Sequence, residues 1–209
     1  EISTDEEGRF RGSPAHIGSI DATHVANCVQ GSVAISCLFE NMCDDGTNQR
    51  SNHARLSAIR DNGDGTTTIT YKGNLSQRSY ENGSRTPSGF CADFEVGNRV
   101  YIYTSGGRLV CDSTAISATK VTGSINVPEY GTKAQTKEVT VSTADVNMAA
   151  LDGYDLTDNA YQSKNKVLVD NMSKASNNFI FDNCKIKNIR SRGLLIKASG
   201  GQIINCSFE

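Results

Sequence analysis

The sequence predicts an all-β protein in which the coils of a parallel β-helix are interrupted by an inserted antiparallel β module. Three observations support this fold class. The 209 residues include 19 Gly and 18 Asn but only three Pro. Gly and Asn tolerate the left-handed backbone of tight turns, whereas the Thr, Val and Ile of the short apolar segments favour strands. Similar apolar segments recur towards both ends of the chain, and the middle contains hairpin-like turns.

The recurring segments carry apolar residues at alternate positions and then a Cys. They are 33–41, 179–188 and 202–209. Cys184 and Cys206 are 22 residues apart, with a further short strand expected at 193–197 between them. This length fits one coil of a parallel β-helix, whose units stack and bury a continuous core. Asn before Cys recurs at corners, where stacked side chains can hydrogen-bond along the ladder. Coincidental alternation in a β-sandwich is the alternative.

The middle of the chain follows a different pattern, with strands that alternate with Asn-Gly and Gly-Gly turns. The expected strands are 56–60, 66–72, 99–103, 109–111, 115–121 and 138–141. Such turns join antiparallel strands, so this region is expected to form a small barrel or sandwich. The turn at Asp61–Gly65 resembles a calcium loop but lacks the later acidic ligand, which favours a plain hairpin.

These patterns divide the chain into four parts. We expect parallel β-helix coils in 1–53, an inserted β-barrel-like module in 54–141 and a connector in 142–166. Coils that continue the first set are expected in 167–209.

Composition excludes several classes of partner. The formal net charge is −2, so there is no basic excess of the kind that binds nucleic acid. No run of about 18 apolar residues is present, which predicts no membrane insertion. The first residues are acidic and polar and do not form an export signal. We expect an extracellular or periplasmic protein whose export signal is not in this chain.

Cysteine usage argues against a disulfide framework or a zinc site. Seven Cys is an odd number, and no CxxC pair occurs. Buried free thiols are the expectation, with one disulfide as the alternative. No cofactor and no metal is predicted.

The acidic residues Asp21, Asp44 and Asp45 are the strongest candidates for chemistry. Asp44 and Asp45 precede Gly46, where a bend can turn both side chains towards one cleft. Asp21 precedes Asp44 by 23 residues, close to one coil, so it is expected on the same face one rung away. Most glycoside hydrolases use a pair of carboxyl groups as their catalytic residues. A solvated acidic turn and a metal site are the alternatives.

Four further residues are candidate substrate-binding groups. His24 and Asn48 lie near these acids in the sequence, and Arg190 and Arg192 are expected at a coil corner. Arginines can hold a carboxylate or sugar hydroxyls in bidentate fashion. An ion pair that holds the loops together is an equally good explanation for the arginines, and a structural role is the common one for a single His.

Three segments resemble the exo-α-1,3-galactosidases of glycoside hydrolase family 110. They are Asp21–His24, Phe39–Asn48 and Asn188–Ile196. The resemblance implies a right-handed parallel β-helix of the pectin-lyase-like type with a small inserted barrel. It implies inverting hydrolysis of terminal α-1,3-linked galactose, as in the blood group B antigen, with Asp44 as the acid and with Asp21 and Asp45 holding the water.

The resemblance is looser elsewhere, and other functions remain open. Gln49, Arg50 and Ser51 follow Asn48, where the family tends to continue with Val-His-Gly. Family members are longer, so a fragment of a longer enzyme is expected, and a homo-oligomer is one way to cover its open strand edges. A non-catalytic carbohydrate-binding or phage tail-spike-like β-helix is the alternative, and a polysaccharide lyase is the third reading.

Overall fold

The computed structural model describes residues 21–73, 93–127, 132–157 and 165–209, together with the backbone of four short strands outside these ranges. Those four strands are β1 (Ser3–Thr4), β2 (Phe10–Arg11), β9 (Gln77–Glu81) and β10 (Ser84–Ser88). The chain divides into two compact units. Unit 1 comprises residues 1–51 and 174–209, and unit 2 comprises residues 52–173.

The described residues form strands and short 3-10 helices, which confirms the all-β prediction. No helix in the described ranges has the length and apolar character needed to cross a bilayer. The two units differ from the expected parts, because residues 142–173 belong to the same unit as the antiparallel strands.

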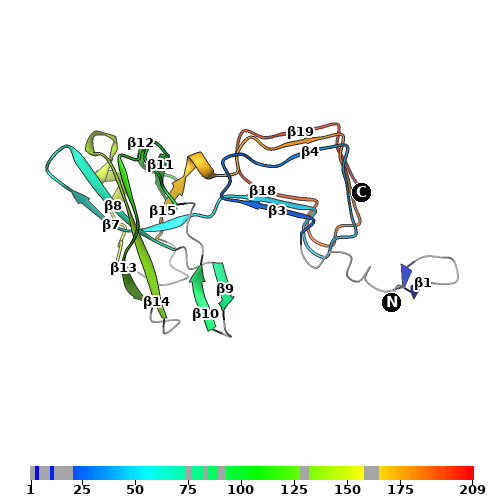
Figure 1. The fold of residues 1–209 in the computed structure, drawn as a ribbon, viewed down its shortest axis with the longest axis horizontal. Coiled ribbons are helices and arrows are strands. Elements are labelled where there is room, and N and C mark those ends of the chain that lie inside the picture. Colours follow the sequence, from blue (N-terminus) through cyan, green and yellow to red (C-terminus); the bar gives the residue numbers. More distant parts are fainter. Residues whose placement is uncertain are drawn as a thin grey trace. The chain divides into compact units, whose positions relative to one another are not determined.

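Unit 1 contains three parallel sheets of three strands each (Figure 1). The first holds β3 (Thr23–Ala26), β6 (Thr47–Arg50) and β18 (Leu194–Lys197). The second holds β4 (Val33–Ile35), β16 (Ile180–Asp182) and β19 (Gln202–Ile204). The third holds β5 (Leu38–Glu40), β17 (Lys185–Lys187) and β20 (Ser207–Phe208).

Each sheet takes one strand from each of three successive passages of the chain. The passages are β3–β4–β5, then β6–β16–β17, then β18–β19–β20. Unit 2 is inserted between β6 and β16, within the second passage. The registers are regular, so that Phe181 pairs with Ala34 on one side and with Ile203 on the other.

The corners between the second and third sheets depend on left-handed backbone. Ser36, Asn183 and Asn205 occupy equivalent corner positions, with φ between 52° and 54°. Asn is among the non-Gly residues that tolerate this conformation best. Asn183 donates from Nδ2 to the Ser36 hydroxyl at 2.9 Å, and Asn205 donates to the Asp182 carboxylate at 3.4 Å. The corner Asn side chains therefore bond to the neighbouring passage, as the sequence predicted.

A Cys follows each of these corner residues, and its thiol points back to the backbone. Cys37, Cys184 and Cys206 each lie within 3.3–3.4 Å of the carbonyl oxygen two residues earlier. The described cysteines are all free thiols, which agrees with the expectation of free rather than paired Cys. Only Cys111 and Cys184 among them are buried, and Cys28 is exposed, so the prediction that the thiols are buried holds for part of the set.

Unit 1 has a small aromatic and aliphatic core. Its buried members are Phe39, Phe179, Phe181, Cys184 and Ile186. The Phe181 ring is edge-on to Phe39 at 6.3 Å and tilted against Phe179 at 5.8 Å. These buried residues belong to the first and second passages, and partly buried Leu194, Ile196 and Cys206 of the third passage pack against them.

Unit 2 is built on one seven-stranded antiparallel sheet. Its order is β12–β11–β15–β7–β8–β14–β13 (Figure 1). The strands are β7 (Ala54–Asp61), β8 (Thr66–Lys72), β11 (Arg99–Thr104), β12 (Leu109–Thr114), β13 (Ser117–Val127), β14 (Thr132–Ser142) and β15 (Val167–Asn171). The antiparallel pairing and six of these strands agree with the sequence prediction.

The sheet also takes in segments that were expected elsewhere. β15 pairs with β7 and β11, although 167–209 was expected to contain coils only. The connector expected in 142–166 contains η2 (Thr143–Asp145) and η3 (Met148–Leu151), and its Ala150 packs into the core of unit 2. The apolar run at the start of β15 suits a strand of either kind of sheet, so the sequence alone cannot decide which partner it takes.

Truncating Phe181 should destabilise unit 1 strongly. Phe181 is fully buried, and Phe→Ala changes in cores cost about 3–5 kcal/mol. Phe208→Ala is the matched control, because that ring is 54% exposed. Urea unfolding with amide exchange of unit 1 as the readout measures both variants. Equal losses in the two variants would contradict the core described for unit 1.

Cys111 should make unit 2 less stable at alkaline pH. Burial, followed by the charges of Asp145 and Asp112, raises the pKa of this thiol from 9.0 to about 12. The unfolded chain therefore ionises first, so the stabilisation is complete below pH 9 and is lost as the pH rises towards 12. Cys111→Val should flatten the decline in unfolding free energy over this window, whereas Cys28→Val should leave the decline unchanged. An unaltered slope in Cys111→Val would refute the assignment.

Candidate functional site

The candidate site lies at the N-terminal ends of the three strands of the first sheet in unit 1. Asp21 precedes β3, Asp45 precedes β6 and Arg192 precedes β18. The backbone ladder continues past the strand ends, since Ala22 donates to Asp45 O at 3.1 Å and Gly46 donates to Arg192 O at 2.8 Å. Asp21, Asp45 and Arg192 therefore occupy equivalent positions on three neighbouring strands.

The bend before β6 lets Asp44 and Asp45 contribute to the same cluster. Residues 43–46 are bent rather than extended, so the strand rule that neighbouring side chains face opposite ways does not apply. One carboxylate oxygen from each of Asp21, Asp44 and Asp45 lies within 4.8 Å of the other two. The convergence expected from the spacing of these acids is therefore present.

Gly46 allows the strands that carry Asp45 and Arg192 to approach closely. A Cβ atom at Gly46 would lie 2.3 Å from the carbonyl oxygen of Gly193, which is a backbone atom and cannot rotate away. Any larger residue would force these two strands apart.

Arg192 neutralises the most deeply buried acid. Its Nε and Nη2 donate to the two oxygens of Asp45 at 2.7 and 3.0 Å, and Asp45 is 1% exposed. Nη2 also lies 3.8 Å from Asp44 Oδ1. The hydrogen bond to Asp45 and then the charges of the acids raise the pKa of Arg192, which keeps it cationic. A buried carboxylate needs such a partner, because an unpaired buried charge is costly.

Asp21 accepts two hydrogen bonds and contacts one histidine. Its Oδ1 accepts the backbone N–H of Asp45 at 3.1 Å, and its Oδ2 accepts Asn48 Nδ2 at 3.3 Å. His24 Nδ1 lies 3.2 Å from the same Oδ2. The Asp21 side chain is 4% exposed, whereas that of Asp44 is 45% exposed. Asp44 is thus the acid most open to solvent.

His24 and Asn48 lie opposite one another on β3 and β6. The His24 side chain is 41% exposed, so its ring faces solvent beside the acids. Asn48 is 7% exposed, and its Oδ1 is a buried acceptor without a partner in the described part of the chain. The contacts of Asn48 position Asp21.

The carboxylates suit a metal ion poorly in this arrangement. Asp21, Asp44 and Asp45 are the described acids that could share an ion. Both oxygens of Asp45 are bound to a guanidinium, and both oxygens of Asp21 already accept N–H donors. A cation bound by Asp45 would have to compete with Arg192 for both of its oxygens.

Arg190 does not join this cluster. Its backbone N–H donates to Met42 O at 3.1 Å, but its side chain is exposed and forms no ion pair with the three acids described here. Of the predicted site residues, the structure therefore brings together three acids, His24, Asn48 and Arg192.

Sequence reasoning missed the partner of Arg192 and a second cluster in unit 2. Aligning 194–197 with 47–50 would have paired Arg192 with Asp45. In unit 2, His53 Nδ1 lies 2.9 Å from Asp170 Oδ2 and 3.3 Å from the Tyr103 hydroxyl. Burial raises the pKa of Tyr103 to about 12. This cluster requires the pairing of β15 with β11, which was not predicted.

Comparison with known proteins gives one partial similarity. No protein-family model matches the chain. A segment of 54 residues, 26% of this chain, is 41% identical to the alpha-1,3-galactosidase A of Shewanella woodyi (strain ATCC 51908 / MS32). The segment spans 8% of the length of that galactosidase, so the similarity points to a galactosidase relationship without establishing the family.

Replacing Arg192 with Lys should destabilise the first sheet of unit 1. Lysine keeps the charge but cannot form both bonds to Asp45, and a hydrogen bond to a charged group contributes about 1.5–3 kcal/mol. Arg190→Lys, two residues away and exposed, should change stability by less than about 0.5 kcal/mol. Urea unfolding compares the two variants. An Arg192→Lys protein as stable as Arg190→Lys would contradict a structural role for the bidentate pair.

Proposed function

We propose that this chain carries the catalytic carboxylates of a glycoside hydrolase that removes terminal α-1,3-linked galactose with inversion. The observation that supports it most is the meeting of Asp21, Asp44 and Asp45 within 4.8 Å, from passages separated in sequence. Such a cluster opposes folding through charge repulsion unless it is compensated, and Arg192 is the arginine or lysine that contacts it among the residues that the structure describes. The similarity to an alpha-1,3-galactosidase supports the choice of an α-1,3-galactoside as the proposed substrate.

Asp44 is the proposed general acid. Its side chain is the most exposed of the three, and its contact with Arg192 is long, at 3.8 Å. A proton donor must reach the glycosidic oxygen of the substrate, which the buried Asp45 cannot do. Asp44 would protonate the leaving oxygen as the bond to the anomeric carbon breaks.

Asp21 and Asp45 are the proposed bases for water. A carboxylate offers about four acceptor sites, of which Asp21 uses three and Asp45 two in the contacts described above. A site on each thus remains to accept a proton from water while the water attacks the anomeric carbon. Solvent exchange then returns the proton to Asp44.

The separation of the acids bears on the stereochemistry. Inverting enzymes keep their two carboxyl groups about 6.5–9.5 Å apart, and retaining enzymes about 5–5.5 Å. The nearest carboxylate oxygens of Asp21, Asp44 and Asp45 lie within 4.8 Å of one another, which is closer to the separation in retaining enzymes. Retention would need Asp21 or Asp45 to bond the sugar directly, but their side chains are only 4% and 1% exposed. A small water can approach such buried carboxylates more readily than a sugar ring can, so inversion is proposed.

His24 is the proposed contact to a sugar hydroxyl, because its partly exposed ring stands beside Asp21. Arg192 and Asn48 would act mainly by holding Asp45 and Asp21 in place. Arg190 is exposed and free to reach a substrate bound above the cluster. A glycan substrate of this kind also fits a protein that works outside the cytoplasm.

We further propose that the three passages of unit 1 are successive coils of a right-handed parallel β-helix, with the three parallel sheets as its faces. The support is the register that relates β3, β6 and β18, and equally the strands of the other two sheets. The left-handed Asn and Ser corners recur in each passage, as expected of stacked units, and one apolar core is shared between the passages.

A non-catalytic carbohydrate-binding β-helix is the competing function. In that case the acids would only accept hydrogen bonds from sugar hydroxyls. The two functions are separated by turnover, because a binding module retains an intact oligosaccharide.

Asp44→Asn should abolish release of galactose while leaving binding in place. Asn keeps the size of the side chain but has no acidic proton to give, so the loss should be at least about 10²-fold. The substrates are a nitrophenyl α-galactoside and the blood group B trisaccharide, and NMR identifies the anomer released first. Asp182→Asn, elsewhere in unit 1, is the matched control.

Three results would count against the proposal. Full activity in Asp44→Asn would reject the acid, and α-galactose as the first product would reject inversion. Binding of the trisaccharide without any turnover by the unaltered chain would favour the binding module.

A further inference from the structure

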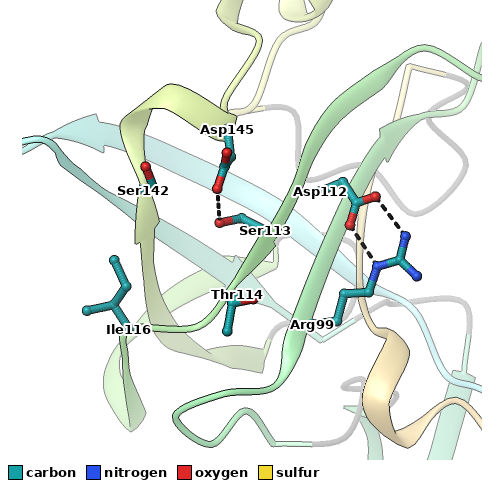
Figure 2. A pocket seen from close by; sticks show the side chains of 7 residues that line it. All are labelled: Arg99, Asp112, Ser113, Thr114, Ile116, Ser142 and Asp145. Atoms are coloured by element: carbon teal, nitrogen blue, oxygen red, sulfur yellow. Dashed lines mark hydrogen bonds and ion pairs between the residues drawn. The ribbon is translucent and has the colours of Figure 1, made fainter.

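Unit 2 contains an open pocket that the proposed hydrolase does not use. Its volume is about 430 Å³, and it lies beside β12, the terminal strand of the seven-stranded sheet. It is lined by Arg99, Asp112, Ser113, Thr114, Ile116, Ser142 and Asp145 (Figure 2). This volume is in the lower part of the range for small-molecule sites, roughly 300–1,000 Å³.

The polar groups of the pocket are organised by two internal contacts. Arg99 forms a bidentate pair with Asp112, both bonds at 2.7 Å, and Ser113 donates to Asp145 Oδ2 at 2.6 Å (Figure 2). The hydrogen bond and the charge of Asp112 raise the pKa of Arg99, and the same bond lowers the pKa of Asp112. The pair is therefore charged but mutually neutralised, and its outer lone pairs and N–H groups remain available.

The lining suits a neutral ligand with many hydroxyl groups. It offers three hydroxyls, two carboxylates and one guanidinium, which can donate to and accept from such a ligand. One cation against two carboxylates disfavours an anion such as a phosphate. A metal ion is also disfavoured, because Arg99 occupies Asp112. Ile116, 49% exposed, adds an apolar surface for the carbon side of a ring.

An aromatic surface continues from the pocket along β11. Tyr101 lies opposite Asp112 in the strand register, and the Arg99 guanidinium carbon is 5.8 Å from the Tyr101 ring. Tyr101 and Tyr103 alternate with buried residues, so they share the outer face of the sheet, with ring centroids 5.7 Å apart. Tyrosine rings combine an apolar face with a polar edge, which suits contact with a sugar ring.

We propose that unit 2 carries a carbohydrate-binding site for a neutral oligosaccharide. One sugar ring fills the pocket beside Asp112, Ser142 and Asp145, and the next ring packs on Tyr101 and Tyr103. The bidentate pair of Arg99 with Asp112 joins the two parts. This site does not depend on the proposed hydrolase activity, because every residue in it belongs to unit 2.

The test uses sugars without terminal α-galactose, so that binding at the proposed active site does not contribute. Lactose, maltotriose and triacetylchitotriose are titrated into the ¹⁵N-labelled chain, with sialyllactose as an anionic comparison. At least one neutral sugar should shift the amide signals of 99–103, 112–116 and 142–145 saturably. Tyr101→Ala should weaken this binding about tenfold, equivalent to about 1.4 kcal/mol.

A second variant and a matched control complete the test. Ser142→Leu should fill the pocket and weaken binding by a similar factor without touching the tyrosines. Tyr154→Ala is the control. The Arg108 guanidinium carbon lies 5.3 Å from the Tyr154 ring centroid, an arrangement like that of Arg99 and Tyr101, but Tyr154 does not line the pocket. Absence of saturable shifts with every neutral sugar at about 10 mM would overturn the proposal. So would equal weakening in the control, or tighter binding of sialyllactose than of lactose.

Discussion

The candidate site depends on the parallel hydrogen-bonded register of β3, β6 and β18. This register aligns Asp21, Asp45 and Arg192 on neighbouring strands, and adjacent strands lie about 4.8 Å apart. At that spacing two carboxylates repel strongly unless a cation intervenes. Arg192 provides it from the third strand, with both donors on the buried Asp45. The chemistry of the cluster is thus a consequence of backbone alignment.

The insertion of unit 2 leaves this alignment intact for a geometric reason. The first strand of the inserted chain, β7, pairs with its last strand, β15, so that Arg55 lies opposite Leu168. An insert whose ends are adjacent in its own fold imposes little loop-closure entropy on its host. The second passage of unit 1 therefore resumes at β16 in the register set by the first, with Phe181 beside Ala34.

The two units use polar side chains differently. In unit 1 the acids converge and one of them, Asp44, remains open to solvent, which is the distribution that proton transfer needs. In unit 2 the charges of Arg99 and Asp112 satisfy one another, and hydroxyls and tyrosines surround them. The first arrangement supports the proposed reaction, and the second supports the proposed recognition of a neutral sugar.

Local patterns in the sequence determined the strands, the turns and the acids. Alternating apolar residues predicted the segments around Phe39 and Phe181, and Asn before Cys predicted the left-handed corners, because few other residues tolerate that backbone. The near-coil spacing of Asp21 and Asp44 predicted their meeting. Only the tertiary structure decided that Arg192 pairs with Asp45 while Arg190 stays in solvent, and that Val167–Asn171 joins the antiparallel sheet. Strand partners and side-chain exposure depend on contacts between residues far apart in the chain, and a local pattern carries no information about them.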